Sequence, residues 1–178
     1  NDFIICLGYK GYMIKEYFCN YSLHMSDITF DMKNNSTTVH SKRVEPWSVT
    51  LVDTGDNSMT GGRLKRVGKY LNDEDFCFTY GDGLSNVNIM KLIEFHKSHG
   101  KKATVTATVP PGRFGALDLA DNNTVKKFVE KPTGKEGYIN GGFFILNPSV
   151  LSYIKNDDSI WEQEPLNNLA TSGELMSY

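Results

Sequence analysis

The sequence has little of what marks several large classes of protein. No apolar run is long enough to cross a bilayer, which predicts a soluble protein. Nineteen Lys and Arg residues face 21 Asp and Glu residues, and a net charge of −2 predicts neither nucleic-acid binding nor attraction to an anionic membrane. The 3 cysteines form no Cys-x-x-Cys pair, so we expect reduced, mostly buried thiols in a cytoplasmic protein. The 4 histidines lack metal-ligand spacing with those cysteines, which argues against a zinc site.

Neither end of the sequence has the features of a finished chain. It begins at Asn1 without an initiator methionine, signal peptide or leader, and enters an apolar strand pattern almost at once. It ends at Tyr178, just after Glu174-Leu175-Met176, which is typical of a strand that is beginning. We therefore expect the sequence to be the interior of a longer chain.

Short apolar strands alternate with amphipathic helices along the sequence. The clearest helix has Ile89, Leu92, Ile93 and His96 at i, i+3, i+4 and i+7, with Gly100 placed to end it. Strands are predicted over residues 3–7, which we expect to be buried on both faces, and over 49–52, 76–80, 103–109, 125–129 and 142–146. A hairpin is predicted over 28–39, helices over 12–18, 64–71 and from Pro148, and a capping box over Ser159–Glu162 ahead of a last helix. The alternation predicts an α/β fold, a three-layer α/β/α sandwich with a mostly parallel, mixed sheet, in one domain spanning 1–178.

Asp82 is the first candidate functional residue. It stands between Gly81 and Gly83 at the end of a predicted strand, and ligands of open α/β sheets bind beyond the carboxyl ends of the strands. Mg²⁺ prefers one or two carboxylates together with phosphate oxygens and water, which makes Asp82 a candidate metal ligand. The alternative is that Gly-Asp-Gly is ordinary turn chemistry.

The stretch from Thr54 to Arg63 has almost nothing to bury. Backbone N–H groups in a loop rich in glycine can meet a phosphate or the edge of a base. The stretch lacks the spacing of a P-loop or of Gly-x-Gly-x-x-Gly, so a flexible surface loop is the alternative. The candidate nucleotide-binding residues are Thr54, Gly55, Thr60, Gly61, Gly62 and Arg63.

A third candidate region combines Glu130-Lys131-Pro132, at the end of a predicted strand, with Asn140-Gly141-Gly142. Lys can contact a phosphate, Glu can accept hydrogen bonds from sugar hydroxyls, and Asn can both donate and accept. A solvated Glu-Lys pair is the alternative here.

The order of these segments resembles the sugar nucleotidylyltransferases. The resemblance rests on Tyr80-Gly81-Asp82-Gly83, Gly112-Arg113-Phe114-Gly115, Phe128-Val129-Glu130-Lys131-Pro132 and Ile139-Asn140-Gly141-Gly142-Phe143-Phe144. Other segments resemble the glucose-1-phosphate cytidylyltransferase family in particular: Gly8-Tyr9-Lys10-Gly11-Tyr12, Arg43-Val44-Glu45-Pro46-Trp47, Leu51-Val52-Asp53-Thr54-Gly55, Met59-Thr60-Gly61-Gly62-Arg63-Leu64 and Trp161-Glu162-Gln163-Glu164-Pro165-Leu166. The resemblance covers essentially all 178 residues.

This resemblance implies the Rossmann-like nucleotide-diphospho-sugar transferase fold and a Mg²⁺-dependent reaction of CTP with α-D-glucose 1-phosphate that gives CDP-glucose and pyrophosphate. It implies that Asp82 is a catalytic metal ligand, that Lys131 is catalytic, and that the Thr54–Arg63 stretch reads the base. The implied sugar-phosphate pocket consists of Gly115, Glu130, Lys131, Asn140 and Gly141. Homo-oligomers are implied too, with Trp47 in subunit contacts or in plain packing, and a product that feeds dideoxyhexose synthesis for bacterial surface polysaccharide.

Two parts of the family pattern are missing from the sequence: an opening Gly-Gly-x-Gly-Thr-Arg loop with its Pro-Lys-Pro segment, and a second metal-binding aspartate. We therefore expect these 178 residues alone to lack transferase activity and, with a sheet edge exposed, to be poorly soluble. One alternative is a homologue that uses UTP, dTTP or another hexose 1-phosphate. A non-catalytic regulatory subunit is another, although retention of Asp82, Glu130 and Lys131 argues against it. A GT-A glycosyltransferase would require an Asp-x-Asp pair that Gly81-Asp82-Gly83 does not supply.

Overall fold

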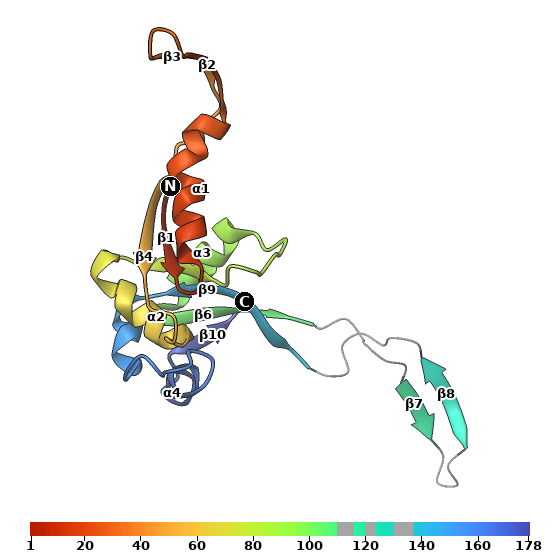
Figure 1. The fold of residues 1–178 in the computed structure, drawn as a ribbon. Helices are drawn as coiled ribbons and strands as arrows, with labels where there is room; N and C mark the ends of the chain where they lie inside the picture. Colours follow the sequence, from red (N-terminus) through yellow and green to blue (C-terminus); the bar gives the residue numbers. More distant parts are fainter. Residues whose placement is uncertain (110–115, 120–123, 130–136) are drawn as a thin grey trace. The chain divides into compact units, whose positions relative to one another are not determined.

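A computed structural model of the protein describes residues 1–109, 116–119, 124–129 and 137–178 (Figure 1). The chain divides into two compact units. Unit 1 comprises residues 1–72 and 154–165, and unit 2 comprises residues 73–153 and 166–178. Among the helices of the described ranges, none has the length and apolar character needed to span a bilayer.

Unit 1 is built on a parallel pair of strands, β1 and β4, aligned from Asp2 opposite Ser48 to Leu7 opposite Asp53. Parallel strands require a long connection, because a tight turn returns the chain antiparallel. Here the connection holds a helix, α1, and the predicted hairpin of β2 and β3. The elements of unit 1 are β1 (Asp2–Leu7), α1 (Gly11–His24), β2 (Ser26–Asp31), β3 (Ser36–Lys42), β4 (Ser48–Asp53), α2 (Thr60–Val67) and the 3₁₀ turn η1 (Gly68–Tyr70).

Strand β1 is present as predicted, but it is not buried on both faces along its whole length. Phe3 is 46% exposed whereas Leu7 is 2% exposed. Within the described ranges β1 pairs only with β4, so burial of β1 increases toward its C-terminal end, where α2 also contacts it. The sequence pattern therefore identified the strand but overestimated how far it is covered.

The core of unit 1 joins the two strands to α2 and to the later segment 154–165. Leu64 and Val67, three positions apart on α2, are buried together with Leu7 and Val52. The segment 154–165 contributes Trp161, whose side chain is 0% exposed. Burying a side chain of this size removes a large apolar area from water, so the segment is an integral part of unit 1.

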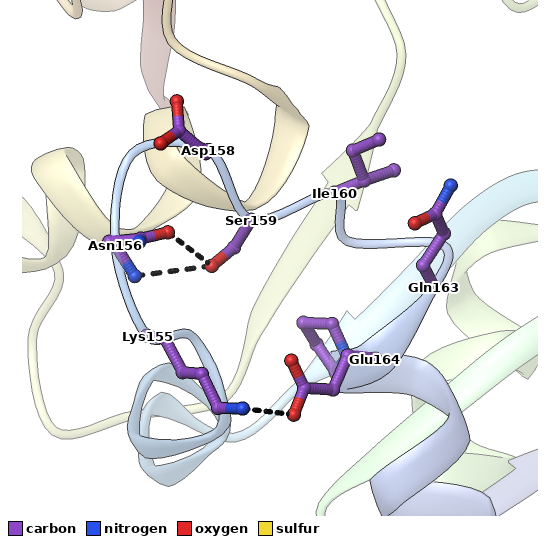
Figure 2. A pocket seen from close by; sticks show the side chains of 8 residues that line it. Lys155, Asn156, Asp158, Ser159, Ile160, Gln163 and Glu164 are labelled. Atoms are coloured by element: carbon purple, nitrogen blue, oxygen red, sulfur yellow. Dashed lines mark hydrogen bonds and ion pairs between the residues drawn. The ribbon is translucent and has the colours of Figure 1, made fainter.

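The capping box predicted at Ser159–Glu162 is wrong. The Ser159 hydroxyl instead donates to Asn156 Oδ1 at 3.2 Å and accepts from the Asn156 N–H at 3.1 Å (Figure 2). The last helix, α4 (Glu164–Thr171), begins two residues after Glu162. Serine competes for nearby backbone groups, and here a local turn takes the hydroxyl before any helix begins.

Unit 2 is built on a mixed sheet with the strand order β10-β6-β9-β5. Strand β9 is antiparallel to both β5 and β6, whereas β10 is parallel to β6. In β9, the residues Phe144, Ile145 and Leu146 are at most 2% exposed, which agrees with the continuous apolar run in the sequence. The predicted α/β class is confirmed, with parallel and antiparallel pairs. The strands of unit 2 are β5 (Phe76–Thr79), β6 (Ala103–Thr108), β7 (Ala116–Leu119), β8 (Val125–Val129), β9 (Ile139–Leu146) and β10 (Leu175–Ser177).

The helix predicted from the clearest periodicity is α3 (Ile89–His99), and its C-terminal end is as expected. Asn88 Oδ1 accepts from the Lys91 N–H at 3.1 Å at the start, and Gly100 ends the helix at φ 63°. Leu92 and His96, four positions apart, are its buried residues. By contrast, the helix predicted from Pro148 is the 3₁₀ turn η2 (Pro148–Tyr153).

The cysteines differ from the expectation of mostly buried thiols. All three are free, Cys6 is half-buried, and Cys19 and Cys77 are exposed. Burial still raises the pKa of the Cys6 and Cys77 thiols, which disfavours the reactive thiolate.

Candidate functional site

Three strand ends meet at one edge of the sheet in unit 2. Because β5 is antiparallel to β9, with Thr79 opposite Phe143, the C-terminal end of β5 lies beside the start of β9. The C-terminal end of β6 lies at the same edge, where Ala107 is opposite Asn140. The Gly81–Gly83 turn and the predicted sugar-binding residue Asn140 are therefore brought to one edge, as expected for a ligand site.

Tyr80 connects the two predicted parts of this edge. The Asn140 side-chain amide donates to the Tyr80 hydroxyl oxygen at 3.3 Å, and Asn140 Oδ1 accepts from the Gly142 N–H at 2.8 Å. Gly142 has φ 79°, and a Cβ there would lie 2.9 Å from Tyr80 Cδ2, so the ring packs where only glycine fits. Tyr80 was not among the predicted site residues, although its place directly before Gly81 was a usable signal.

Asp82 lies on the exposed turn after β5. A Cβ placed on Gly81 would meet nothing within 4 Å, so the turn is open on that side. No cluster of three or more His, Cys, Asp or Glu side chains suited to a metal occurs in the described part of the chain. A single accessible carboxylate fits Mg²⁺ when phosphate and water oxygens complete its coordination.

The remaining predicted sugar-site residues divide into two groups. Asn140 is exposed and Gly141 is half-buried, with a Cβ on Gly141 placed 2.9 Å from the Thr106 carbonyl oxygen. Gly115, Glu130 and Lys131 lie outside the described residues.

In unit 1, the C-terminal ends of β1 and β4 are joined through the Leu7 carbonyl. This oxygen accepts from the Thr54 N–H at 2.8 Å, from the Thr54 hydroxyl at 2.8 Å and from Arg63 Nη1 at 3.1 Å. Thr54 is 0% exposed. The Thr54 hydroxyl therefore links the C-terminal ends of β1 and β4 in this structure.

Arg63 turns its guanidinium toward the loop that precedes its own helix. Besides Leu7, Nη1 donates to Thr54 Oγ1 at 2.9 Å and Nη2 donates to the Asp56 carbonyl at 3.2 Å. A Cβ on Gly8 would lie 2.5 Å from Arg63 Nη1, so the guanidinium packs directly against the backbone there. Contact of Arg63 with a nucleotide stays a prediction.

The first turn of α2 binds another part of its own chain. The N–H groups of Gly61 and Gly62 both donate to the Ser159 carbonyl, at 2.9 and 3.2 Å. The Thr60 hydroxyl donates to Glu162 Oε2 at 2.7 Å and accepts from the Trp161 N–H at 2.9 Å. Residues 60–63, predicted as part of a loop, are thus helical, and three candidate nucleotide contacts are engaged within unit 1.

Arg66, which was not predicted as a site residue, contacts the same loop. Its Nη1 donates to the Thr54 carbonyl at 3.0 Å, while Nε and Nη2 donate to the two carboxylate oxygens of Asp157 at 2.9 and 2.5 Å. The Arg66 guanidinium lowers the pKa of Asp157 by hydrogen bonding to its carboxylate. The i, i+3 spacing of Arg63 and Arg66 on one helix could have indicated a shared target.

Aromatic side chains gather on another part of unit 1. Trp47 stacks on Tyr21 with ring centroids 6.0 Å apart and meets the edge of Phe3 at the same separation. Together with Phe18, Tyr21 and Trp47 line a hollow of about 270 Å³. Trp47 is 44% exposed. Its packing role is visible, and the predicted subunit contact stays a prediction.

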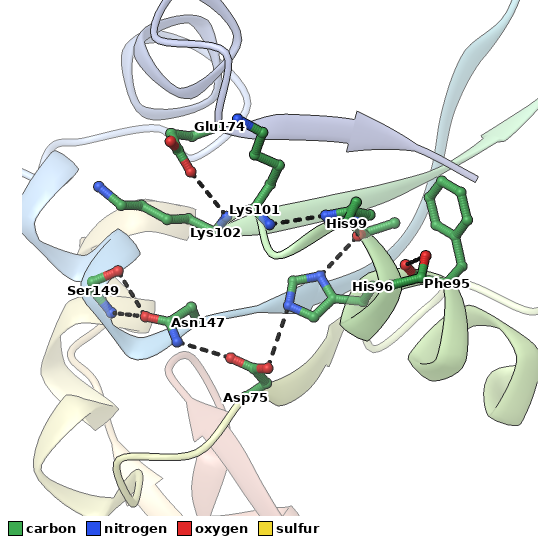
Figure 3. A network of polar contacts seen from close by, with 11 residues as sticks. Asp75, Phe95, His96, His99, Lys101, Lys102, Asn147, Ser149 and Glu174 are labelled. Carbon is green, nitrogen blue, oxygen red and sulfur yellow. Dashed lines mark hydrogen bonds and ion pairs between the residues drawn. The ribbon is translucent and has the colours of Figure 1, made fainter.

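A polar network lies at the opposite ends of the unit 2 strands (Figure 3). The Thr104 hydroxyl is 2.8 Å from both His96 Nδ1 and His99 Nε2, and His96 Nε2 is 3.5 Å from Asp75. Asp75 also accepts from the Asn147 amide at 2.9 Å. Burial lowers the pKa of both histidines, so the network favours neutral imidazoles.

Comparisons with known proteins agree with this architecture. The nucleotidyl transferase family matches residues 26–172. A glucose-1-phosphate cytidylyltransferase of Salmonella typhimurium is 65% identical over 178 residues, which cover 99% of this chain and 69% of that protein. A mannose-1-phosphate guanyltransferase of Aspergillus fumigatus is 35% identical over 126 residues, covering 67% of this chain and 35% of that protein. The crystal structure of HddC from Yersinia pseudotuberculosis shares the fold, with a TM-score of 0.62 at 22% identity, covering 99% of this chain and 68% of that one.

Proposed function

Because this chain belongs to the nucleotidyl transferase family, we propose that it transfers CMP from CTP to α-D-glucose 1-phosphate, giving CDP-glucose and pyrophosphate. The observation that carries the proposal is the 65% identity over 178 residues to a glucose-1-phosphate cytidylyltransferase. The placement of Asp82 and Asn140 at one sheet edge supports it, because this is where open α/β sheets bind ligands.

The reaction is a phosphoryl-type displacement. An oxygen of the sugar phosphate attacks the α-phosphorus of CTP, and the bond from that phosphorus to the oxygen bridging to the β-phosphate breaks, so pyrophosphate leaves with its electrons. No enzyme nucleophile is required, and catalysis rests on positioning and on neutralising charge.

At the sheet edge of unit 2 we assign the sugar phosphate to Asn140 and Gly141. Asn140 donates one amide hydrogen bond to the Tyr80 hydroxyl. Because Asn140 is exposed, its polar atoms can still contact sugar hydroxyls. We also assign Gly115, Glu130 and Lys131 to this pocket, with Lys131 as the proposed phosphate contact. Asp82 would hold Mg²⁺, which when bound neutralises phosphate charge and orients the leaving pyrophosphate.

We assign the nucleotide to the Thr54–Arg63 stretch of unit 1. Since Thr60, Gly61 and Gly62 are engaged with the segment 159–162, their part in binding is to shape the loop that precedes them. The proposed contacts with the nucleotide are Thr54, Gly55 and Arg63, and Arg63 also supports Thr54 by donating to its hydroxyl. The proposal includes selection of cytosine over the other bases.

The test is product formation by the complete gene product that carries these residues. CDP-glucose should form from CTP and glucose 1-phosphate with Mg²⁺, and much less product should form with UTP, dTTP or GTP. Asp82→Asn should reduce kcat by roughly 100-fold or more, because charge neutralisation at phosphate is lost. Asp73→Asn, an exposed aspartate just before β5, is the matched control for stability and expression. Preferred use of UTP or dTTP would favour a homologue of different specificity, and ligand binding without turnover would favour a regulatory subunit.

Further expectations accompany this function. We also propose one nucleotidyltransferase domain, cytoplasmic placement and homo-oligomers, the last measurable by light scattering. The product would then supply dideoxyhexose synthesis for bacterial surface polysaccharide.

A further inference from the structure

The loop 54–58, called here the nucleotide loop, is shaped partly by its own residues. Gly55 has φ 85°, and its N–H donates to Asp53 Oδ1 at 2.9 Å. The Ser58 hydroxyl donates to the Thr54 carbonyl at 2.6 Å. These local bonds define the turn, but they do not fix it against the rest of unit 1.

Leu7 and Arg63 attach the loop to unit 1 through the Thr54 N–H, the Thr54 hydroxyl and the Asp56 carbonyl, and Arg66 adds an attachment at the Thr54 carbonyl. Its Nη1 donates to the same Thr54 carbonyl, and a Cβ on Gly55 would lie 2.8 Å from this nitrogen. The guanidinium therefore lies directly against the positive-φ glycine of the loop. A shift of Arg66 would remove one of the two hydrogen bonds that the Thr54 carbonyl accepts, leaving the local bond from Ser58.

Asp157 fixes the plane of that guanidinium. The two side chains form a bidentate ion pair. Two parallel hydrogen bonds hold the planar guanidinium in one orientation, which a lysine ammonium would not allow. The Asp157 backbone is itself attached to α2, because its carbonyl accepts from the Met59 N–H at 2.9 Å. The side chains of Arg66 and Asp157 are 43% and 51% exposed, and exposed ion pairs contribute little to stability. Orientation is thus the larger effect of this pair.

We propose that Arg66 and Asp157 are positioning residues for nucleotide binding. They hold the Thr54 carbonyl, and through it the nucleotide loop, in the shape that meets the nucleoside part of the triphosphate. The inference rests on the proposed function, and it assigns a role in substrate affinity to the segment 154–165, far along the sequence from the loop.

The test compares three variants of the complete gene product. Asp157→Asn keeps the shape of the side chain but removes its charge and one acceptor. We expect the KM for CTP to rise roughly tenfold, below the ~100-fold that a 1 Å misplacement can cause, with kcat and the KM for glucose 1-phosphate nearly unchanged. Asp157→Glu, which keeps the carboxylate, should recover much of the loss.

Glu164→Gln is the matched control, because it breaks another exposed ion pair of the same segment. Lys155 Nζ lies 2.5 Å from Glu164 Oε1 across a hollow of about 220 Å³ (Figure 2). This variant should leave the KM for both substrates unchanged. An equal rise of both KM values in Asp157→Asn, or the same effect in Glu164→Gln, would overturn the positioning role.

Equilibrium binding separates this inference from the proposed function. Absence of CDP-glucose formation by the unmodified protein would defeat the function, whereas the dissociation constants of CTP, UTP, dTTP and GTP can still be measured. If the nucleotide that binds best loses no affinity in Asp157→Asn, or if none binds the unmodified protein, the inference is wrong.

Discussion

Gly62 offers a sharp test of how α2 packs, because its α-carbon faces backbone rather than a movable side chain. A Cβ built on Gly62 would lie 2.6 Å from the Asp157 α-carbon and 2.7 Å from the Asp157 carbonyl carbon. Both residues belong to unit 1, and the Gly62 N–H also bonds to the Ser159 carbonyl. Replacing Gly62 by alanine therefore forces the segment 157–159 away from the helix.

Two opposing effects set the magnitude. Alanine is favoured over glycine within a helix by about 1 kcal/mol, so helix propensity alone would make Gly62→Ala stabilising. Overpacking costs about 1–3 kcal/mol, and the upper end applies here because a backbone neighbour cannot rotate away. We expect a net loss of about 2 kcal/mol in the free energy of unfolding, which for a chain of this size lowers Tm by about 4–8 °C.

Urea titration and thermal unfolding followed by circular dichroism measure this loss. Gly81→Ala is the matched control, since a Cβ there meets nothing within 4 Å, and its stability should match that of the unmodified protein. If Gly62→Ala is as stable as the unmodified protein, α2 does not approach residues 157–159 as closely as described, and the reasoning fails.

Three further predictions concern unit 2. Asn88→Ala removes the oxygen that caps α3 and should lower the free energy of unfolding by about 1 kcal/mol, measured by urea titration; no change would show that the cap is replaced by water. Thr104→Val removes the hydroxyl between His96 and His99 and should cost about 1–3 kcal/mol, since buried polar atoms lose a partner; a neutral result in thermal unfolding would contradict this. Burial lowers the pKa of both histidines, so the unfolded chain binds more protons than the folded chain as the pH falls. The contribution of these histidines to the free energy of unfolding is therefore fully present above the ordinary histidine pKa of about 6.5 and is lost as the pH falls below it. Urea midpoints that stay constant from about pH 7.5 to about pH 5 would refute this prediction.

Local pattern was sufficient for much of unit 2. The spacing of Ile89, Leu92 and His96, with Gly100 behind them, predicted α3 and its C-terminal end, because periodicity and a left-handed glycine are properties of neighbouring residues. The pattern over residues 142–146 likewise predicted a strand, and the structure has it as part of β9. Asp82 was placed at a strand end by the same reasoning, and the sheet then put Asn140 beside that end.

The sequence by itself determined the order of strands and helices, the family pattern and the turns that carry the candidate residues. Tertiary structure decided what those residues contact. Thr60 bonds to Glu162 across 102 residues, and Arg66 bonds to Asp157 across 91, so no local pattern could show that the first turn of α2 is engaged by its own chain. Glycines and arginines near a strand end suit either a ligand or a neighbouring backbone equally well in hydrogen-bonding terms. Which of the two they contact depends on which distant segment lies within about 3 Å, and only the folded chain sets that distance.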